Sequence, residues 1–106
     1  MKAIQVLVLE GCPNIDAALE NIRAAIASTK VSADIDIVRI ESVEAAVRLR
    51  FLGSPTVRVD GIDVESAAEA RGDFGMQCRV YAVGGRFSGT PPVAWIAAAL
   101  AGEIRS

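Results

Sequence analysis

With 106 residues, of which 52% are apolar and 23% charged, the chain is long enough for one domain with a single core and too apolar for a disordered segment. Its formal net charge is −2 and its basic residues are scattered, which argues against a nucleic-acid partner. The absence of histidine excludes Cys-His and Ser-His-Asp catalysis and leaves the two cysteines as the side chains of most chemical interest.

A strand and a helix are expected at the start of the chain. Residues 4–9 form a near-continuous apolar run, typical of a central parallel strand covered on both faces. From residue 13 to about residue 28 the apolar side chains recur instead at helical spacing, at Ile15, Leu19, Ile22 and Ile26. Cys12 is then expected near the N-cap of this helix, with Pro13 at its first position, where the missing N–H costs nothing.

A second strand and helix follow. Residues 35–40 alternate in part between apolar and charged side chains, as a half-buried strand does. Ser42 is a preferred N-cap for a helix over residues 43–51, which Gly53 is expected to end. Strand, helix, strand and helix in this order predict a right-handed crossover and a parallel pair of strands.

The second half of the chain is expected to form two strands and a helix. Residues 56–59 alternate as a short strand, and Asp60-Gly61 is a strong tight-turn signal. Residues 62–64 could pair back, but residues 78–83 form the better fourth strand. A final helix is expected to open at residues 90–92, with an apolar stripe of Val93, Ile96, Ala97 and Leu100.

The most informative stretch is Gly11-Cys12-Pro13-Asn14, where the first strand meets the first helix. A thiol at a helix start faces unpaired backbone N–H groups and the positive end of the helix dipole, which favour the thiolate. Because thiolates are nucleophiles, this position predicts sulfur chemistry. The alternative interpretation is a small buried apolar side chain, since free cysteine is often buried and inert.

The order β-α-β-α-β-β-α, with a cysteine after the first strand and Ser54-Pro55-Thr56 before the third, resembles the thioredoxin-like fold. The resemblance covers essentially the whole chain. It implies one α/β domain over residues 1–106, with three layers and a four-stranded mixed sheet. In that family the proline before the third strand has a cis peptide bond and lies against the active-site cysteine.

The same resemblance implies roles for individual residues. Cys12 would be the attacking thiol that forms a mixed disulfide with glutathione or a protein thiol. The proline bend would offer its backbone N–H and C=O groups to a bound chain by strand-like pairing. No cofactor and no metal are expected, apart from glutathione as a co-substrate. The expected substrate-binding residues are Gly11, Pro13, Ser54, Pro55 and Thr56.

The chain departs from the family in its sulfur chemistry. Ile15 stands where the second cysteine of a C-x-x-C motif belongs, and Val6 stands where thioredoxins place a buried carboxylate. The motif G-C-P-N is closer to a group of small bacterial thioredoxin-like proteins of unassigned function, and this likeness implies no mechanism. Whether the protein is an enzyme therefore stays open.

Cys78 is a possible second thiol. In the expected hairpin the strand over residues 78–83 ends near Pro55, so Cys78 would lie at its far end, roughly 20 Å away. A disulfide needs α-carbons within about 7 Å, so on this geometry Cys78 does not bridge Cys12. A register shift caused by the long polar stretch before it would change that geometry, and a small side chain packed in a strand is the other interpretation.

Three functions stay open from the sequence. The first is a thiol-dependent redox protein. The second is a binding module that keeps the fold without catalysis and docks partners on residues 65–77. The third is soft-metal handling by Cys12 and Cys78, alone or across a dimer.

The remaining expectations concern location and charge. No apolar run reaches the roughly 18 residues of a membrane span, and the N-terminal apolar run is too short for a signal peptide, so we expect a cytoplasmic protein with reduced thiols. The sequence does not indicate an oligomeric state. Scattered arginines are expected to be solvated or, near the helix start, to bind a glutathione carboxylate. These arginines are Arg50, Arg58 and Arg79.

Overall fold

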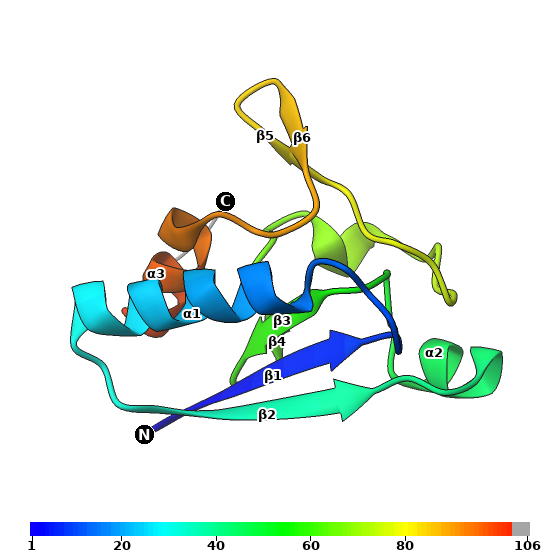
Figure 1. Ribbon diagram of the computed structural model, residues 1–106, viewed down its shortest axis with the longest axis horizontal. Coiled ribbons are helices and arrows are strands. Elements are labelled where there is room, and N and C mark those ends of the chain that lie inside the picture. Colours follow the sequence, from blue (N-terminus) through cyan, green and yellow to red (C-terminus); the bar gives the residue numbers. More distant parts are fainter. Residues whose placement is uncertain (103–106) are drawn as a thin grey trace.

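A computed structural model describes residues 1–102 and shows a mixed α/β architecture built on a four-stranded sheet (Figure 1). The spatial order of the strands is β2-β1-β3-β4. β1 (Lys2–Val8) pairs in parallel with β2 (Ala33–Arg39) and antiparallel with β3 (Thr56–Val59). β3 in turn pairs antiparallel with β4 (Ile62–Asp63). The first strand is therefore central, as the apolar run predicts, and the sheet is mixed.

The three helices pack on the two faces of this sheet. α1 (Ile15–Thr29) and α3 (Val93–Leu100) pack together on one face, and α2 (Val43–Arg48) contributes to a second core. Successive side chains of β1 point to opposite faces, so Val6 belongs to the first core and Leu7 to the second. No helix within residues 1–102 is long and apolar enough to cross a membrane.

The larger core lies between the sheet and the pair α1 and α3. The stripe expected for the final helix is confirmed, because Ile96 and Leu100 are buried and Val93 and Ala97 pack against them. The helix itself begins after Pro92, so the prolines precede it instead of forming its first turn. The buried members of this core are Ile4, Val6, Val8, Ile22, Ala25, Val57, Val59, Val64, Ile96 and Leu100.

The start of α2 is as expected, but its end is not. The Ser42 hydroxyl accepts a hydrogen bond from the Ala45 N–H at 3.0 Å, which confirms the N-cap. The helix ends at Arg48, before the expected end at residue 51, and Arg50 adopts a left-handed conformation with φ of 55°. Gly53 therefore has another role, in the site described below.

The fourth strand is the main departure from the expected fold. Asp60 and Gly61 have φ of 50° and 83° and close a tight hairpin, so β4, and not residues 78–83, pairs with β3. A 3₁₀ turn, η1 (Ala68–Ala70), follows. β5 (Tyr81–Val83) then pairs with β6 (Arg86–Ser88) in a separate hairpin that projects from the body of the molecule (Figure 1).

Candidate functional site

The bend before β3 is an interior feature of the molecule. The Ser54–Pro55 peptide bond is cis, as the resemblance implies. Ser54 and Thr56 are almost fully buried, with exposed fractions of 1% and 0%. The Thr56 hydroxyl donates to the Gly53 carbonyl at 2.6 Å and tightens the bend.

The segment that contains Cys78 is paired with this bend. The Ser54 N–H donates to the Gln77 carbonyl at 2.9 Å, and the Arg79 N–H donates to the Ser54 carbonyl at 3.1 Å. Cys78 thus forms a parallel bridge with Ser54. The expectation that Cys78 lies at the far end of a strand, away from Pro55, is wrong, because residues 78–80 are not a strand of the main sheet.

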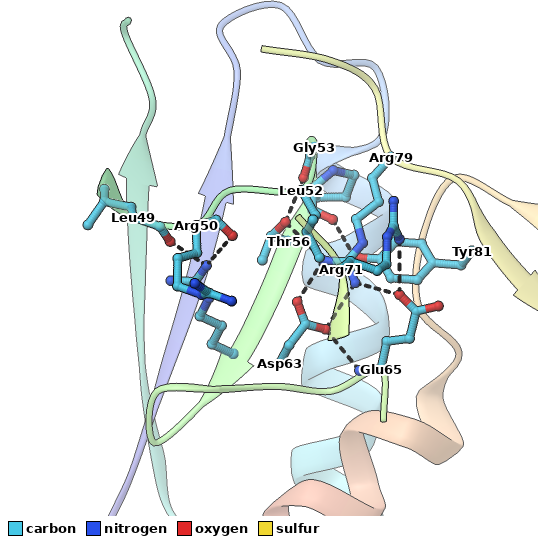
Figure 2. A network of polar contacts seen from close by, with 12 residues as sticks. Leu49, Arg50, Leu52, Gly53, Thr56, Asp63, Glu65, Arg71, Arg79 and Tyr81 are labelled. Carbon is cyan, nitrogen blue, oxygen red and sulfur yellow. Dashed lines mark hydrogen bonds and ion pairs between the residues drawn. The ribbon is translucent and has the colours of Figure 1, made fainter. Parts of the chain in front are cut away.

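Arg79 fixes this segment through a buried polar network (Figure 2). Its two terminal nitrogens donate to the Asp63 carboxylate at 2.7 and 3.0 Å, and to Glu65 and Thr56 at 2.7 and 3.0 Å. Its guanidinium carbon lies 4.5 Å from the centre of the Tyr81 ring. Burial opposes the charge, but the bonds to Asp63 and Glu65 outweigh it and hold the pKa of Arg79 above its ordinary value. Arg79 is an anchor and is not available to a ligand carboxylate.

Two further residues explain how closely the segment that contains Cys78 approaches the Ser54-Pro55 bend. The hydroxyl of the buried Tyr81 donates to the Pro55 carbonyl at 2.6 Å, and burial raises the pKa of that hydroxyl. Gly53 has φ of 129°, and a Cβ at this position would lie 2.9 Å from the Cβ of Arg79. A side chain at residue 53 would therefore separate the two backbones, which is why a glycine is needed here.

Sequence reasoning missed this arrangement because the pattern of residues 78–81 is inverted. The charged Arg79 and the aromatic Tyr81 are buried, whereas Cys78 is exposed and Val80 has an exposed fraction of 56%. Hydropathy alone predicts the opposite, with Val80 in the core and Arg79 at the surface. The available signal is the alternation itself, which indicates an extended segment but not which of its sides is buried.

Cys12 closes a turn between β1 and α1. Its N–H donates to the Leu9 carbonyl at 3.2 Å. Gly11, the third residue of this turn, has φ of 79°, which is typical of a type II turn. The side chain of Cys12 is partly exposed. The thiol therefore belongs to a defined turn and is accessible.

The helix after this turn begins later than the sequence predicts. α1 starts at Ile15 with Asn14 as N-cap, so Pro13 precedes the helix and Cys12 lies two positions before the cap. Asparagine is a preferred N-cap residue and was the available signal, although its side chain makes no capping bond here and instead packs against Gly89. Cys12 therefore lies outside the first turn of α1, and the expectation that it stands near the N-cap is wrong.

The structure brings the two cysteines to the same bend. The Leu9 N–H donates to the Ser54 hydroxyl oxygen at 3.0 Å, and the Leu9 carbonyl accepts from Cys12. Ser54 is therefore connected to Cys12 through Leu9, which bonds to both residues. The backbone of Ser54 is also bridged to Cys78.

The residues expected to bind a partner fall into two groups. The two that flank the cysteine are exposed, whereas the three in the bend are buried. The backbone N–H and C=O of Ser54, which the resemblance offers to a bound chain, are already bonded to residues 77 and 79. The expected strand-like pairing is thus made within the chain itself. The exposed residues are Gly11 and Pro13, and the buried ones are Ser54, Pro55 and Thr56.

A cavity of about 410 Å³ lies near the bend and contains two of the arginines considered for anion binding. The Arg50 guanidinium stacks 4.9 Å from the centre of the Phe74 ring, and burial lowers the pKa of Arg58. Asp63 and Glu69 line the same cavity. With two guanidinium groups and two carboxylates, the cavity has no excess of positive charge for a glutathione carboxylate.

Comparison of the chain with family models, with curated proteins and with solved structures found no match to any of them. Among the described residues, no group of three or more cysteine, aspartate or glutamate side chains could hold a metal ion. The class that the fold and site define is a mixed α/β protein with two free cysteines beside a proline bend.

Proposed function

We propose that the chain is a thioredoxin-like redox protein that uses Cys12 to form a mixed disulfide with glutathione or a protein thiol. The observation that carries this proposal is the position of Cys12. It lies in an accessible turn connected through Leu9 to the buried Ser54-Pro55 bend. The mixed sheet, with its central first strand and helices on both faces, supports the thioredoxin-like part of the proposal.

In the reaction, the Cys12 thiolate attacks one sulfur of a disulfide. A bond between the Cys12 Sγ and that sulfur forms as the original S–S bond breaks, and the other sulfur leaves as a thiolate that takes up a proton. The exposed Gly11 and Pro13 leave the approach to the thiol open. An external thiol then releases the bound group and restores Cys12.

The occupied backbone of Ser54 supports a compact first substrate. An extended polypeptide that paired with Ser54 would have to displace Gln77 and Arg79, which already bond to it. A small disulfide such as oxidised glutathione needs only access to the Cys12 sulfur. The cytoplasm suits the second half of this reaction, because reduced glutathione there supplies the external thiol that restores Cys12.

The test is the reaction of the reduced chain with glutathione disulfide. A Cys78→Ser variant should gain one glutathione, located at Cys12 by peptide mass spectrometry. The matched control, Cys12→Ser, keeps the exposed Cys78 and measures the rate of an ordinary surface thiol, which the proposal requires Cys12 to exceed. Equal rates in the two variants would show that Cys12 has no special reactivity and would remove the proposal.

A further inference from the structure

Cys78 has a fixed position and an accessible thiol. Its two neighbours bond to the backbone of Ser54, and the Gln77 side chain also donates to the Leu52 carbonyl at 3.1 Å. The side chain of Arg79, the next residue, has no exposed area. Cys78 itself is exposed. The segment therefore holds the thiol at the surface while its backbone is secured from within.

The bridge also determines the side on which Cys78 lies. Residues paired across two strands lie about 4.8 Å apart and project their side chains to the same side. The side chain of Ser54 points toward the turn of Cys12, because its oxygen accepts a hydrogen bond from the Leu9 N–H at 3.0 Å. Cys78 therefore projects on the side of the bend that faces the turn of Cys12.

The thioredoxin-like resemblance assigns the backbone of Ser54 to a partner, and the chain places its own Cys78 there. From this arrangement we infer that Cys78 is the second thiol of the site and releases the mixed disulfide of Cys12 within the same chain. This inference rests on the proposed function, and it identifies Cys78 as the thiol that reacts with the mixed disulfide of Cys12.

The full reaction balances with glutathione disulfide as the oxidant. Cys12 first forms a mixed disulfide and releases one glutathione. The Cys78 thiolate then attacks the Cys12 Sγ, the bond between Cys12 and glutathione breaks, and the second glutathione leaves as a thiolate that takes up a proton. The two protein thiols lose two electrons and two protons, and one glutathione disulfide becomes two glutathione molecules.

The experiment compares the products that the full-length chain forms with glutathione disulfide. The wild-type chain should lose two hydrogens and keep no glutathione, and a peptide with Cys12 should be linked to one with Cys78. Cys78→Ser should stop with one glutathione on Cys12. A disulfide requires α-carbons within about 7 Å, so the linked peptides report directly on proximity.

A relocated thiol provides the matched control. Ser66 is exposed and lines a second cavity with Lys2, at the start of β1, whereas Cys12 follows the end of that strand. Seven residues of strand separate these ends by roughly 20 Å. The double variant Cys78→Ser, Ser66→Cys should therefore form glutathione adducts without an internal disulfide. Circular dichroism checks that every variant is folded.

The outcomes separate the inference from the proposed function. If the wild-type chain keeps glutathione on Cys12 and forms no internal disulfide, the inference is wrong and the proposed function stands. A disulfide that joins two chains, or an internal disulfide in the relocated variant, also overturns the inference. If Cys12 takes up no glutathione in Cys78→Ser, the proposed function itself is wrong.

Discussion

Arg79 shows how a single buried charge organises the site. Its carboxylate partners come from β4 and the residue two positions after it, and its hydroxyl partner begins β3. The Arg79 Nε is buried without a hydrogen-bond partner among residues 1–102. Because buried ion pairs repay their desolvation only in part, this network is weak evidence for stability. Its clearer effect is positional, since it determines where Cys78 lies.

A substitution at Gly53 tests the close approach of the two backbones. In Gly53→Ala the new Cβ meets the Cα and Cβ of Arg79 at 3.0 and 2.9 Å, and φ stays at a value that side chains disfavour. We expect a loss of about 1–3 kcal/mol in the free energy of unfolding, measured with urea. The rate of Cys78 alkylation should rise in the same variant as its segment loosens.

The control for this prediction is Gly72→Ala. A Cβ at Gly72 has no atom within 4 Å, so we expect a change within about 0.5 kcal/mol. If Gly53→Ala and Gly72→Ala unfold at the same urea concentration, the close contact with Arg79 is not the reason for a glycine at residue 53.

At the scale of elements, α2 depends on its cap. The helix has six residues, too few to be stable by propensity alone, and its first turn is closed by the Ser42 oxygen. We expect Ser42→Ala to lower the free energy of unfolding by about 1 kcal/mol. Ser42→Asp keeps an acceptor and should unfold close to the wild-type midpoint in urea. Equal losses in both variants would mean that the hydroxyl does not act as a cap.

The segment from residue 65 to 77 makes defined polar contacts and contains the 3₁₀ turn η1. The Gly75 N–H donates to the Phe51 carbonyl at 3.1 Å, and Arg71 pairs with Asp73 at 2.7 Å. The first contact joins the segment to the chain that leads into the bend, and the second lies within the segment. Its role as a docking surface stays a prediction, while its position explains how Cys78 reaches Ser54.

The hairpin of β5 and β6 also differs from its expected packing. The sequence indicates core or edge packing for Phe87, yet its exposed fraction is 81%. Tyr81, at the start of the same hairpin, is buried and contacts Trp95 edge to face at 6.2 Å. Only the base of the hairpin is therefore joined to the core, and its far end projects from the molecule (Figure 1).

At the scale of the whole molecule, the buried Tyr81 makes the free energy of unfolding depend on pH in alkaline solution. Burial raises the pKa of Tyr81 above its ordinary value of about 10, and the charge of Arg79 only partly opposes this. Above pH of about 10 the unfolded chain loses the tyrosine proton while the folded chain keeps it. Since the unfolded state then binds fewer protons, the free energy of unfolding should fall as pH rises, with no loss from this group below that pH.

The measurement is direct because the chain has a single tyrosine. Tyrosinate absorbance should appear at higher pH in the folded chain than in urea. Tyr81→Phe loses the bond to the Pro55 carbonyl and should be about 1 kcal/mol less stable at neutral pH, yet decline less steeply above pH of about 10. Parallel alkaline declines in the two proteins would contradict the assignment.

Local patterns predicted the first half of the fold well. The apolar run of β1, the helical spacing of α1 and the cap of α2 each depend on residues close in sequence, and all three appear in the structure. The fourth strand was wrong because the apolar alternation of residues 78–83 outweighed the two residues of β4. The pairing of Ser54 with Cys78 joins distant parts of the chain, and no local signal indicates it.

The two edge strands of the sheet, β2 and β4, determine whether two copies of the molecule can pair through their sheets. β4 offers only two residues for further pairing, and β2 exposes Asp34 and Asp36 along its length. A second copy that paired with β2 in parallel and in register would bring like charges together, and at β4 it would find almost no backbone to bind. We therefore expect that the protein does not form fibrils by pairing at its edge strands, β2 and β4, even in concentrated solution.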